Sequence, residues 1–308
     1  MGANPFSAAA GYNNLSQGNW SPVVFSKKAL KFFRTVSVVE EITNTDFLGE
    51  IKGQGSEVEI IKEPLMSTQR YKRGTKLVTQ DLNDENLVLV IDQGIATQFV
   101  MDDIEKAFSH IGWVALAQGS AGYALRNEFD QEVLEFMLAG ATQGTGTGTD
   151  ATTVSIGFDT GDDFTPLNYI LRFKRLLDEN DVIEIGRWFT ATPEFYEALG
   201  QEDSKLVDVS VMGDDQSMIL RAMKMGANRM VHGFTLFQTN NQPTSITNSR
   251  ITVLAGHTSA VSTATAMTES ETIRAQDTFG DIYRSLLVYG RGIVRPEALF
   301  MGHITINL

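Results

Sequence analysis

The four histidines of the sequence are the side chains best suited to acid–base catalysis or to binding a transition metal. They are His110, His232, His257 and His303. None of them belongs to a His-Glu-x-x-His motif or lies beside an aspartate at a metal-ligand spacing, so each is interpreted as structural. The segment Gly-His-Thr-Ser at 256–259 lacks the Gly-x-Ser-x-Gly pattern of a nucleophile turn.

Pairs of adjacent aspartates could bind Mg²⁺ or Ca²⁺ through their oxygen atoms. The pairs are Asp102-Asp103, Asp162-Asp163 and Asp214-Asp215. Adjacent acids more often cap helices or occupy loops, and no EF-hand spacing is present. The Gly/Thr-rich segment 141–163 has neither the dinucleotide fingerprint nor the P-loop pattern, and its aspartates would repel phosphate. The sequence therefore predicts no catalytic, cofactor-binding or metal site, and it favours a structural protein over an enzyme.

Two clusters of basic residues stand out in a chain whose formal net charge is −13. The first basic cluster precedes every acidic residue and consists of Lys27, Lys28, Lys31 and Arg34. The second basic cluster lies in a polar stretch between two strand-like segments and consists of Arg70, Lys72, Arg73 and Lys76. Basic clusters in an acidic chain predict docking onto an acidic surface, against the alternative of an ordinary solvated face.

The composition limits the classes to which the protein can belong. With 42% hydrophobic and 20% charged residues over 308 positions, the chain is globular rather than disordered. Its negative charge repels phosphate and argues against sequence-specific binding of nucleic acid. The absence of cysteine excludes disulfides and thiolate metal sites. The first 24 residues read as an extended arm without the features of a secretory signal.

The segment from Asp102 to Gly140 predicts one long helix around which the other elements are arranged. Its apolar positions recur at steps of three, four and seven, which places them on one face. They are Ile104, Phe108, Ile111, Ala115, Gly122, Phe129, Val133 and Phe136. Asp102 can cap the start and Gly140 the end, while the charged residues between them exclude a membrane span. Two shorter helices in a globular enzyme are the alternative, because internal glycines such as Gly112 and Gly119 weaken a helix.

Residues 48–91 alternate apolar and polar side chains, as two half-buried strands do. They predict a long two-stranded hairpin whose tip carries the second basic cluster. Because an isolated two-stranded ribbon is only marginally stable in water, it must be covered by the core of this chain or by a neighbouring subunit.

The rest of the chain mixes helices and strands without regular alternation, which is typical of an α+β fold. Helices are predicted over 164–180 and 193–201, each begun by a Thr-Pro pair. Strands are predicted over 181–191 and over 251–256. A further strand at 229–240 contains Gly233, which predicts a bulge or a close backbone approach.

The C-terminal residues 281–304 are rich in apolar side chains and predict more strand or helix around a turn at Gly290–Gly292. The preceding stretch, from His257 to Gln276, is small and polar.

The order of these elements, together with several short segments, resembles the major capsid proteins of tailed bacteriophages, which have the Hong Kong 97-type fold. The segments are RWFTATPEFY at 187–196, NRMVHGF at 228–234 with TNN at 239–241, AGHTSA at 255–260, and VYG with RPEAL between 288 and 299. Each segment is short, but they follow the family's order, and the resemblance spans most of residues 25–300.

The resemblance implies a division of the chain into five parts. These are an N-terminal arm (1–48), an extended two-stranded E-loop (49–90), a long spine helix with the peripheral domain (91–181), an axial domain (182–285) and a returning segment of the peripheral domain (286–308). The E-loop would lie over a neighbouring subunit, and the two basic clusters would form contacts between subunits.

In function, the resemblance implies self-assembly into the pentamers and hexamers of an icosahedral phage head that encloses double-stranded DNA without reading its sequence. The chain would belong to the virion, would assemble in the host cytoplasm, and would have no enzymatic activity, cofactor or membrane. Because only about 48 residues precede the E-loop, a separate scaffolding protein is implied, unless the chain has already been processed. A portal and an optional decoration protein are further expected partners. A lysine–asparagine cross-link is not predicted.

Two other interpretations stay open. An encapsulin-like cellular compartment would have the same fold with an enzyme as cargo, and neighbouring genes would distinguish it from a phage head. A soluble α+β enzyme with an unrecognised site would show a deep pocket with converging acids.

Overall fold

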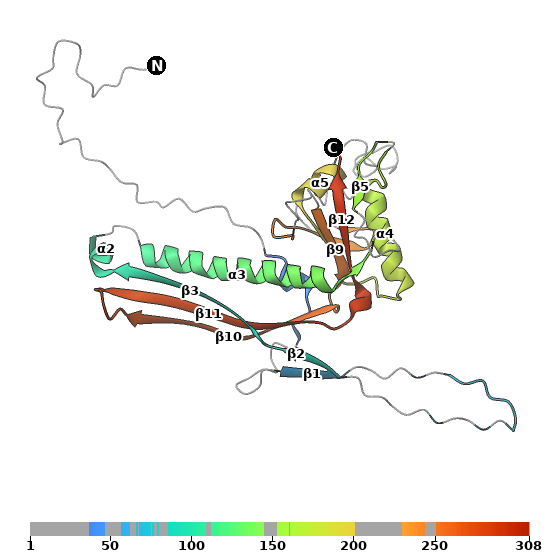
Figure 1. Ribbon diagram of the computed structural model, residues 1–308, viewed down its shortest axis with the longest axis horizontal. Helices are drawn as coiled ribbons and strands as arrows, with labels where there is room; N and C mark the ends of the chain where they lie inside the picture. The colour runs from blue at the N-terminus through green and yellow to red at the C-terminus, as the bar shows by residue number, and fades with distance from the viewer. Residues whose placement is uncertain are drawn as a thin grey trace, which may run out of the picture.

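The computed structural model describes residues 37–46, 57–61, 66, 68–74, 76, 79, 86–108, 112–144, 153–159, 161–200, 230–243 and 251–307. In this part of the chain, a seven-stranded sheet with helices stands at one end of an elongated layer, in which a long helix lies on a three-stranded sheet (Figure 1). A two-stranded ribbon packs where the two meet.

The helices are α1 (Val39–Ile42), α2 (Asp103–Phe108), α3 (Trp113–Gly140), α4 (Pro166–Glu179), α5 (Pro193–Leu199) and the 3₁₀ helix η3 (Pro296–Ala298). The strands are β1 (Glu57–Ile61), β2 (Asn86–Val90), β3 (Gln93–Asp102), β4 (Thr142–Gln143), β5 (Val154–Ile156), β6 (Arg187–Ala191), β7 (Met230–Val231), β8 (Phe234–Gln238), β9 (Ile251–His257), β10 (Val261–Arg274), β11 (Gly280–Ile293) and β12 (Leu299–Ile306). The mixture is α+β, as the sequence predicts.

The seven-stranded sheet has the order β4-β12-β9-β6-β8-β7, with β5 also paired to β12. One face is covered by α4 and α5, whose apolar residues pack with Phe189 of β6 in an aromatic core. The helix α4 forms as predicted, because the Thr165 hydroxyl accepts a hydrogen bond from the Asn168 amide and Pro166 occupies the first turn. Its buried face presents Tyr169 and Phe173 to the sheet.

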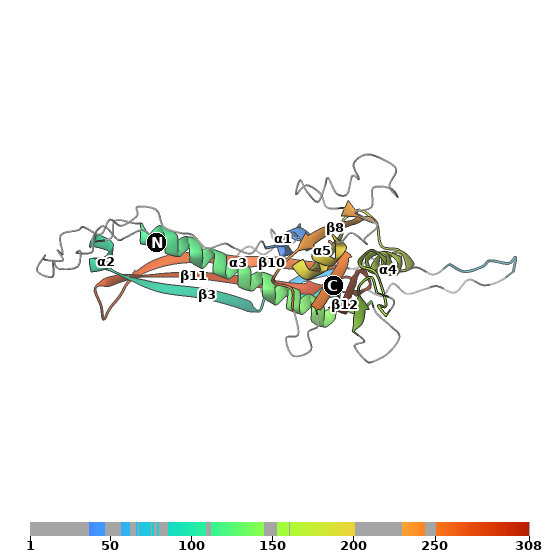
Figure 2. The same cartoon turned by 90° about the horizontal axis from the view of Figure 1, so that it is seen from above.

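The three-stranded sheet has the order β10-β11-β3, with antiparallel pairing along almost the whole of each strand. The helix α3 lies lengthwise on one face of it (Figures 1 and 2). Phe129 of α3 stacks edge-on against Tyr289 of β11, with ring centroids 4.7 Å apart. Further along, Val133 and Met137 are fully buried between α3 and the seven-stranded sheet, where they pack in one cluster with Trp188. The C-terminal half of α3 therefore joins the two layers.

The long helix begins later than the sequence predicts. Asp102 is the last residue of β3, and α2 is a separate helix of six residues. The helix α3 has 28 residues, which corresponds to about 42 Å. The prediction of one helix from residue 102 is therefore wrong at its N-terminal end, and Ile104, which was placed on the buried face, is 66% exposed.

Three further expectations are corrected by the strand geometry. Gly233 belongs to a tight turn with His232 between β7 and β8, with both residues at positive φ, and not to a bulge. Gly290 and Gly292 mark no turn, because both lie within β11, where they pair with β10. A Cβ at either position would collide with residues from 89 to 91. The strand predicted over 181–191 begins only at Arg187.

The ribbon of β1 and β2 is antiparallel, with Val58 opposite Leu89. Both side chains are buried against Ala264 of β10, so this end of the ribbon is covered by the chain itself.

The short helix α1 attaches the N-terminal segment to α3 through one buried carboxylate. Asp130 of α3 is fully buried. Its Oδ1 accepts hydrogen bonds from the amides of Val38 and Val39, both at 3.0 Å, and from the Ser37 hydroxyl at 2.9 Å. Its Oδ2 accepts from the side-chain amide of Asn241 at 3.0 Å. Three segments that are distant in sequence therefore meet at Asp130.

Replacing Gly302 by alanine is expected to lower the free energy of unfolding by about 1–3 kcal/mol. A Cβ at this position of β12 would collide with the hydroxyl of the fully buried Tyr169. That hydroxyl has no hydrogen-bond partner among the described residues, so Tyr169→Phe should be neutral or stabilising and should rescue Gly302→Ala. Urea denaturation of both single variants and the double variant measures this. An equal loss in Gly302→Ala and the double variant would contradict it.

No helix within the described ranges is long and apolar enough to cross a membrane.

Candidate assembly surfaces

The second basic cluster lies on an exposed stretch of chain that extends beyond β1 and β2, away from both larger sheets (Figure 1). All four of its basic side chains are exposed. None of them forms an ion pair with another residue that the structure describes, and Met66 and Tyr71 beside them are each 65% exposed. Four positive charges without an ion-pair partner in the described part of the chain, together with two exposed apolar side chains, are typical of a surface that contacts another molecule. The first basic cluster (Lys27, Lys28, Lys31 and Arg34) lies outside the described residues.

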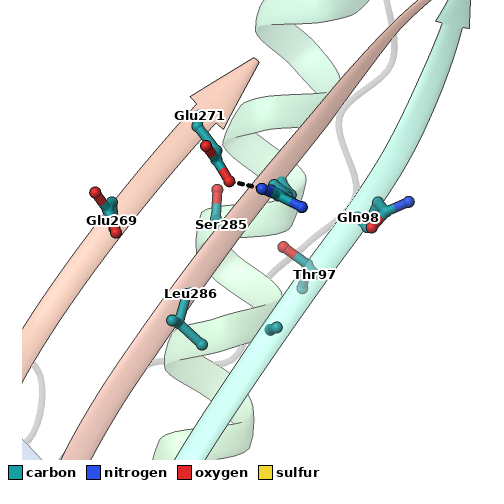
Figure 3. A pocket seen from close by; sticks show the side chains of 8 residues that line it. Thr97, Gln98, Glu269, Glu271, Ser285 and Leu286 are labelled. Atoms are coloured by element: carbon teal, nitrogen blue, oxygen red, sulfur yellow. Dashed lines mark hydrogen bonds and ion pairs between the residues drawn. The ribbon is translucent and has the colours of Figure 1, made fainter. Parts of the chain in front are cut away.

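The open face of the three-stranded sheet carries a shallow acidic groove (Figure 3). Side chains alternate along a strand, so Arg284 and Leu286 of β11 point away from α3, whereas Leu287 and Tyr289 point toward it. The groove has a volume of about 360 Å³ and includes Glu269 and Glu271 of β10.

Charge in this acidic groove is not balanced. Glu271 is paired with Arg284 across the strands, as the dashed line in Figure 3 shows. Glu269 has no ion-pair partner among the described residues. Gln98 of β3 adds an amide at the opposite side of the groove. The groove therefore presents one uncompensated carboxylate and a neutral polar wall, which favours a cationic side chain as its occupant.

The far end of the elongated layer is held by a network of exposed ion pairs. Arg274 of β10 bonds both oxygens of Asp103 in α2, one of them at 2.9 Å, and also Asp281 of β11 at 3.1 Å. Lys106 lies 3.2 Å from the second oxygen of Asp281. The hydrogen bonds from Arg274 are the main reason why the pKa values of both aspartates lie below the usual 3.8.

Replacing Arg274 by alanine is expected to raise the pKa of Asp103 back toward its ordinary value. The pKa of Asp281 should rise less, because Lys106 still bonds it. Both carboxyl groups have a lower pKa in the folded protein than in the unfolded chain. The ion pairs therefore contribute to stability at pH values above the ordinary carboxyl pKa, and this contribution is lost as the pH falls through the lowered pKa values. Titration of the carboxyl carbons by NMR measures both groups. Arg175→Ala, which removes a different surface pair, should leave them unchanged.

Large apolar side chains are exposed at both ends of the molecule. Phe279, in the turn between β10 and β11, is 80% exposed, and Val100 of β3 is 62% exposed. At the other end, Ile183 and Ile185 are exposed between α4 and β6. Within the described ranges, no group of three or more histidine, aspartate or glutamate side chains could hold a metal ion.

The geometry has counterparts among solved phage structures. A structure from Mycobacterium phage Che8 aligns over 94% of this chain and 97% of its own, with a TM-score of 0.76 and 23% sequence identity. The capsid of cyanophage P-SCSP1u aligns over 94% of both chains, with a TM-score of 0.71 and 19% identity. The chain has the fold of phage capsid proteins. The mature capsid of bacteriophage PhiM1 aligns over 99% of both chains, with a TM-score of 0.69 and 15% identity.

The likeness to phage capsid proteins is evident from the structure and not from the sequence, because sequence identities of 15–23% are too low to show a relationship by themselves. No protein-family model matches the sequence, and no curated protein matches it either. Because the alignments cover nearly the whole of each chain, the shared fold includes both sheets and the long helix.

The acidic groove was missed by the sequence analysis, although a signal for it exists. The segment Glu269-Ser270-Glu271-Thr272-Ile273 has its two glutamates two positions apart, which is the spacing of side chains on one face of a strand. Had it been interpreted as a strand, Glu269 and Glu271 would have been placed on one face. Their pairing with β11 could not have been inferred, because it depends on the register of a partner strand.

Proposed function

We propose that this chain is the major capsid protein of a tailed bacteriophage, and that its copies form the pentamers and hexamers of an icosahedral head around double-stranded DNA. The near-complete alignment with phage capsid structures carries the proposal. The protein acts structurally, within the virion, and assembles in the host cytoplasm. A scaffolding protein, a portal and an optional decoration protein are its further partners.

We assign the parts of such a subunit to the observed layers. The spine helix is α3, and the peripheral domain consists of α3 with the three-stranded sheet. The axial domain is built on the seven-stranded sheet. The boundary expected between residues 285 and 286 falls inside β11, so we assign all of β10 and β11 to the peripheral domain and β12 to the axial domain. The E-loop is the ribbon of β1 and β2 with the segment that joins them.

The second basic cluster, at the tip of the E-loop, binds the acidic groove of a neighbouring copy. Three observations support this contact: the cluster is exposed, its charges are unpaired among the described residues, and the groove has an excess of carboxylate. The first basic cluster contributes a second contact between subunits of the same kind. An overall charge of −13 also suits a container, because it keeps packaged DNA from adhering to the wall.

Negative-stain electron microscopy of the purified protein, alone and with the candidate scaffolding protein, tests the proposed function. Closed shells, or separate pentamers and hexamers, are expected. If only single subunits are found under both conditions, the proposal is wrong. Shells that contain an enzyme instead of DNA in the native host would indicate a cellular compartment.

A further inference from the structure

The stretch of chain from Thr68 to Lys72, between β1 and β2, has the form of a protease substrate. Every residue in it is exposed, and none belongs to a helix, strand or turn. The stretch extends away from both larger sheets (Figure 1). Because an extended segment can bind another protein through its main chain, this stretch needs no unfolding before a protease can cut it.

The stretch also supplies a basic side chain at a suitable position. Trypsin-like proteases cut after arginine or lysine, whose charge is bound by a carboxylate of the protease. Arg70 lies in the middle of the stretch, so the bond between Arg70 and Tyr71 has exposed, irregular chain on both sides. The bond after Arg73 is less suitable, because Arg73 and Gly74 form a turn in which Gly74 has φ +91°. This turn would have to open before the segment became extended.

The structure protects the other lysines and arginines that it describes, apart from those of the second basic cluster. Each lies in a helix or strand, with the exception of Arg295. The bond after Arg295 leads to Pro296, whose ring fixes φ and which has no N–H. Cutting inside a helix or strand requires local unfolding first. Arg126 illustrates this protection, because its side chain is 57% exposed but its backbone lies in the middle of α3.

A cut after Arg70 would leave the subunit folded, because the N-terminal piece has its own anchors. Val39 and Ile42 of α1 are fully buried in one cluster with Val133 of α3. The amide of Thr263 donates a hydrogen bond to the carbonyl of Asn44 at 3.0 Å. The strand β1 of the N-terminal piece also pairs with β2 of the other piece along its whole length. The two pieces would thus stay attached without a covalent bond.

We propose that the Arg70–Tyr71 bond is a cleavage site for proteases of trypsin-like specificity in the unassembled subunit, and that the cleaved subunit stays folded as two associated pieces. In this hydrolysis, water adds across the peptide bond, so that Arg70 gains a carboxylate and Tyr71 an amino group. The cleavage itself does not depend on the proposed shell. One consequence rests on the proposed function: contact through the second basic cluster should cover this bond in assembled particles.

Brief digestion of the dissociated, full-length subunit with trypsin, followed by mass spectrometry, tests the cleavage site. One fragment that ends at Arg70 and one that begins at Tyr71 are expected. The cleavage rate after Arg70 should lie within about tenfold of that in a synthetic peptide of residues 64–79, because no unfolding has to come first. The rate after Arg126 should be at least about a hundredfold lower than in a peptide of residues 120–132. Protection of the Arg70 bond as strong as that of the Arg126 bond would overturn the inference.

Size-exclusion chromatography of the cleaved subunit tests whether the two pieces stay together. They should elute together in buffer and separate in urea, and separate elution in buffer would overturn this part of the inference. The matched control is Tyr71→Pro, which keeps every charge of the second basic cluster and should block the cut after Arg70. Appearance of a fragment ending at Arg70 in this control would show that trypsin is not acting on the bond as proposed.

Digestion of assembled particles distinguishes this inference from the proposed function. The cleavage rate after Arg70 is expected to fall at least about tenfold on assembly, because a covered segment must first be released. Equal rates in particles and dissociated subunits would contradict the contact proposed for the second basic cluster, while the cleavage site itself would stand. If no particles form at all, the proposed function fails, and digestion of the dissociated subunit still decides the inference.

Discussion

Reversing every charge of the second basic cluster is expected to abolish shell assembly while the subunit stays folded. The variant carries glutamate at Arg70, Lys72, Arg73 and Lys76. These side chains are exposed and form no ion pair with other described residues, so each substitution should change the free energy of unfolding by no more than about 0.5 kcal/mol. Each reversal changes the charge by two units, so the four change the net charge from −13 to −21. Attraction to the acidic groove then becomes repulsion.

Circular dichroism on heating and negative-stain electron microscopy measure the two parts of this prediction. The control variant exchanges lysine and arginine at the same four positions and keeps every charge, so it should still form shells. A rescue identifies the partner surface: Glu269→Lys with Glu271→Lys should restore assembly to the reversed subunit. Normal shells from the reversed subunit alone would show that the cluster does not act between copies. Wild-type assembly should also weaken with salt, because exposed charges are screened.

Local sequence patterns were sufficient to predict a helix or strand wherever its own residues determine where it begins or how it pairs. The Thr-Pro pairs at 165–166 and 192–193 begin α4 and α5. The two alternating segments before residue 91 pair as β1 and β2. Each of these features depends on contacts within a few residues or on a period along the chain.

Other features were not predicted correctly, because they depend on contacts with residues that are distant in the sequence. Residues 93–102 alternate in burial as β3, yet the strand was not predicted and its last residue was assigned to the helix. The isoleucines at 183 and 185 have strand propensity, but the carbonyl of Ile185 is bonded by His257, which lies 72 residues further along the chain. This tertiary hydrogen bond could not be inferred from the local sequence.

Asp130 is the clearest example of this limit. At a helical position flanked by Glu128 and Glu132 it reads as part of a solvated face, and the sequence analysis treated the charges of this segment only as evidence against a membrane span. Its partners lie about 90 residues before it and about 110 residues after it in the chain. The structure instead gives it a central role, because it joins the N-terminal segment, α3 and the stretch after β8.

Replacing Asp130 by alanine is expected to lower the free energy of unfolding by about 3–5 kcal/mol, because buried donors lose a charged acceptor. The amides of Val38 and Val39 and the side chain of Asn241 would lose the acceptor that they share in the native state. Relief from burying a carboxylate offsets part of this loss. Asp130→Asn should lower the free energy of unfolding by less than Asp130→Ala, because the amide oxygen of asparagine still accepts hydrogen bonds. It should not match wild type, because the amide nitrogen would face other donors. A loss of this size is a large fraction of the stability of an ordinary domain.

Chemical denaturation followed by circular dichroism measures the effect of each variant. Glu128→Ala is the matched control, since Glu128 lies on the same helix but is exposed, and it should change the free energy of unfolding by no more than about 0.5 kcal/mol. Hydrogen exchange at the amides of Val38 and Val39 gives a local readout, because both should lose protection in Asp130→Ala. If Asp130→Ala were as stable as Glu128→Ala, with both amides still protected, α1 would be held by its apolar contacts alone. The buried side chains of Val39 and Ile42 would then be sufficient to attach the N-terminal segment to α3.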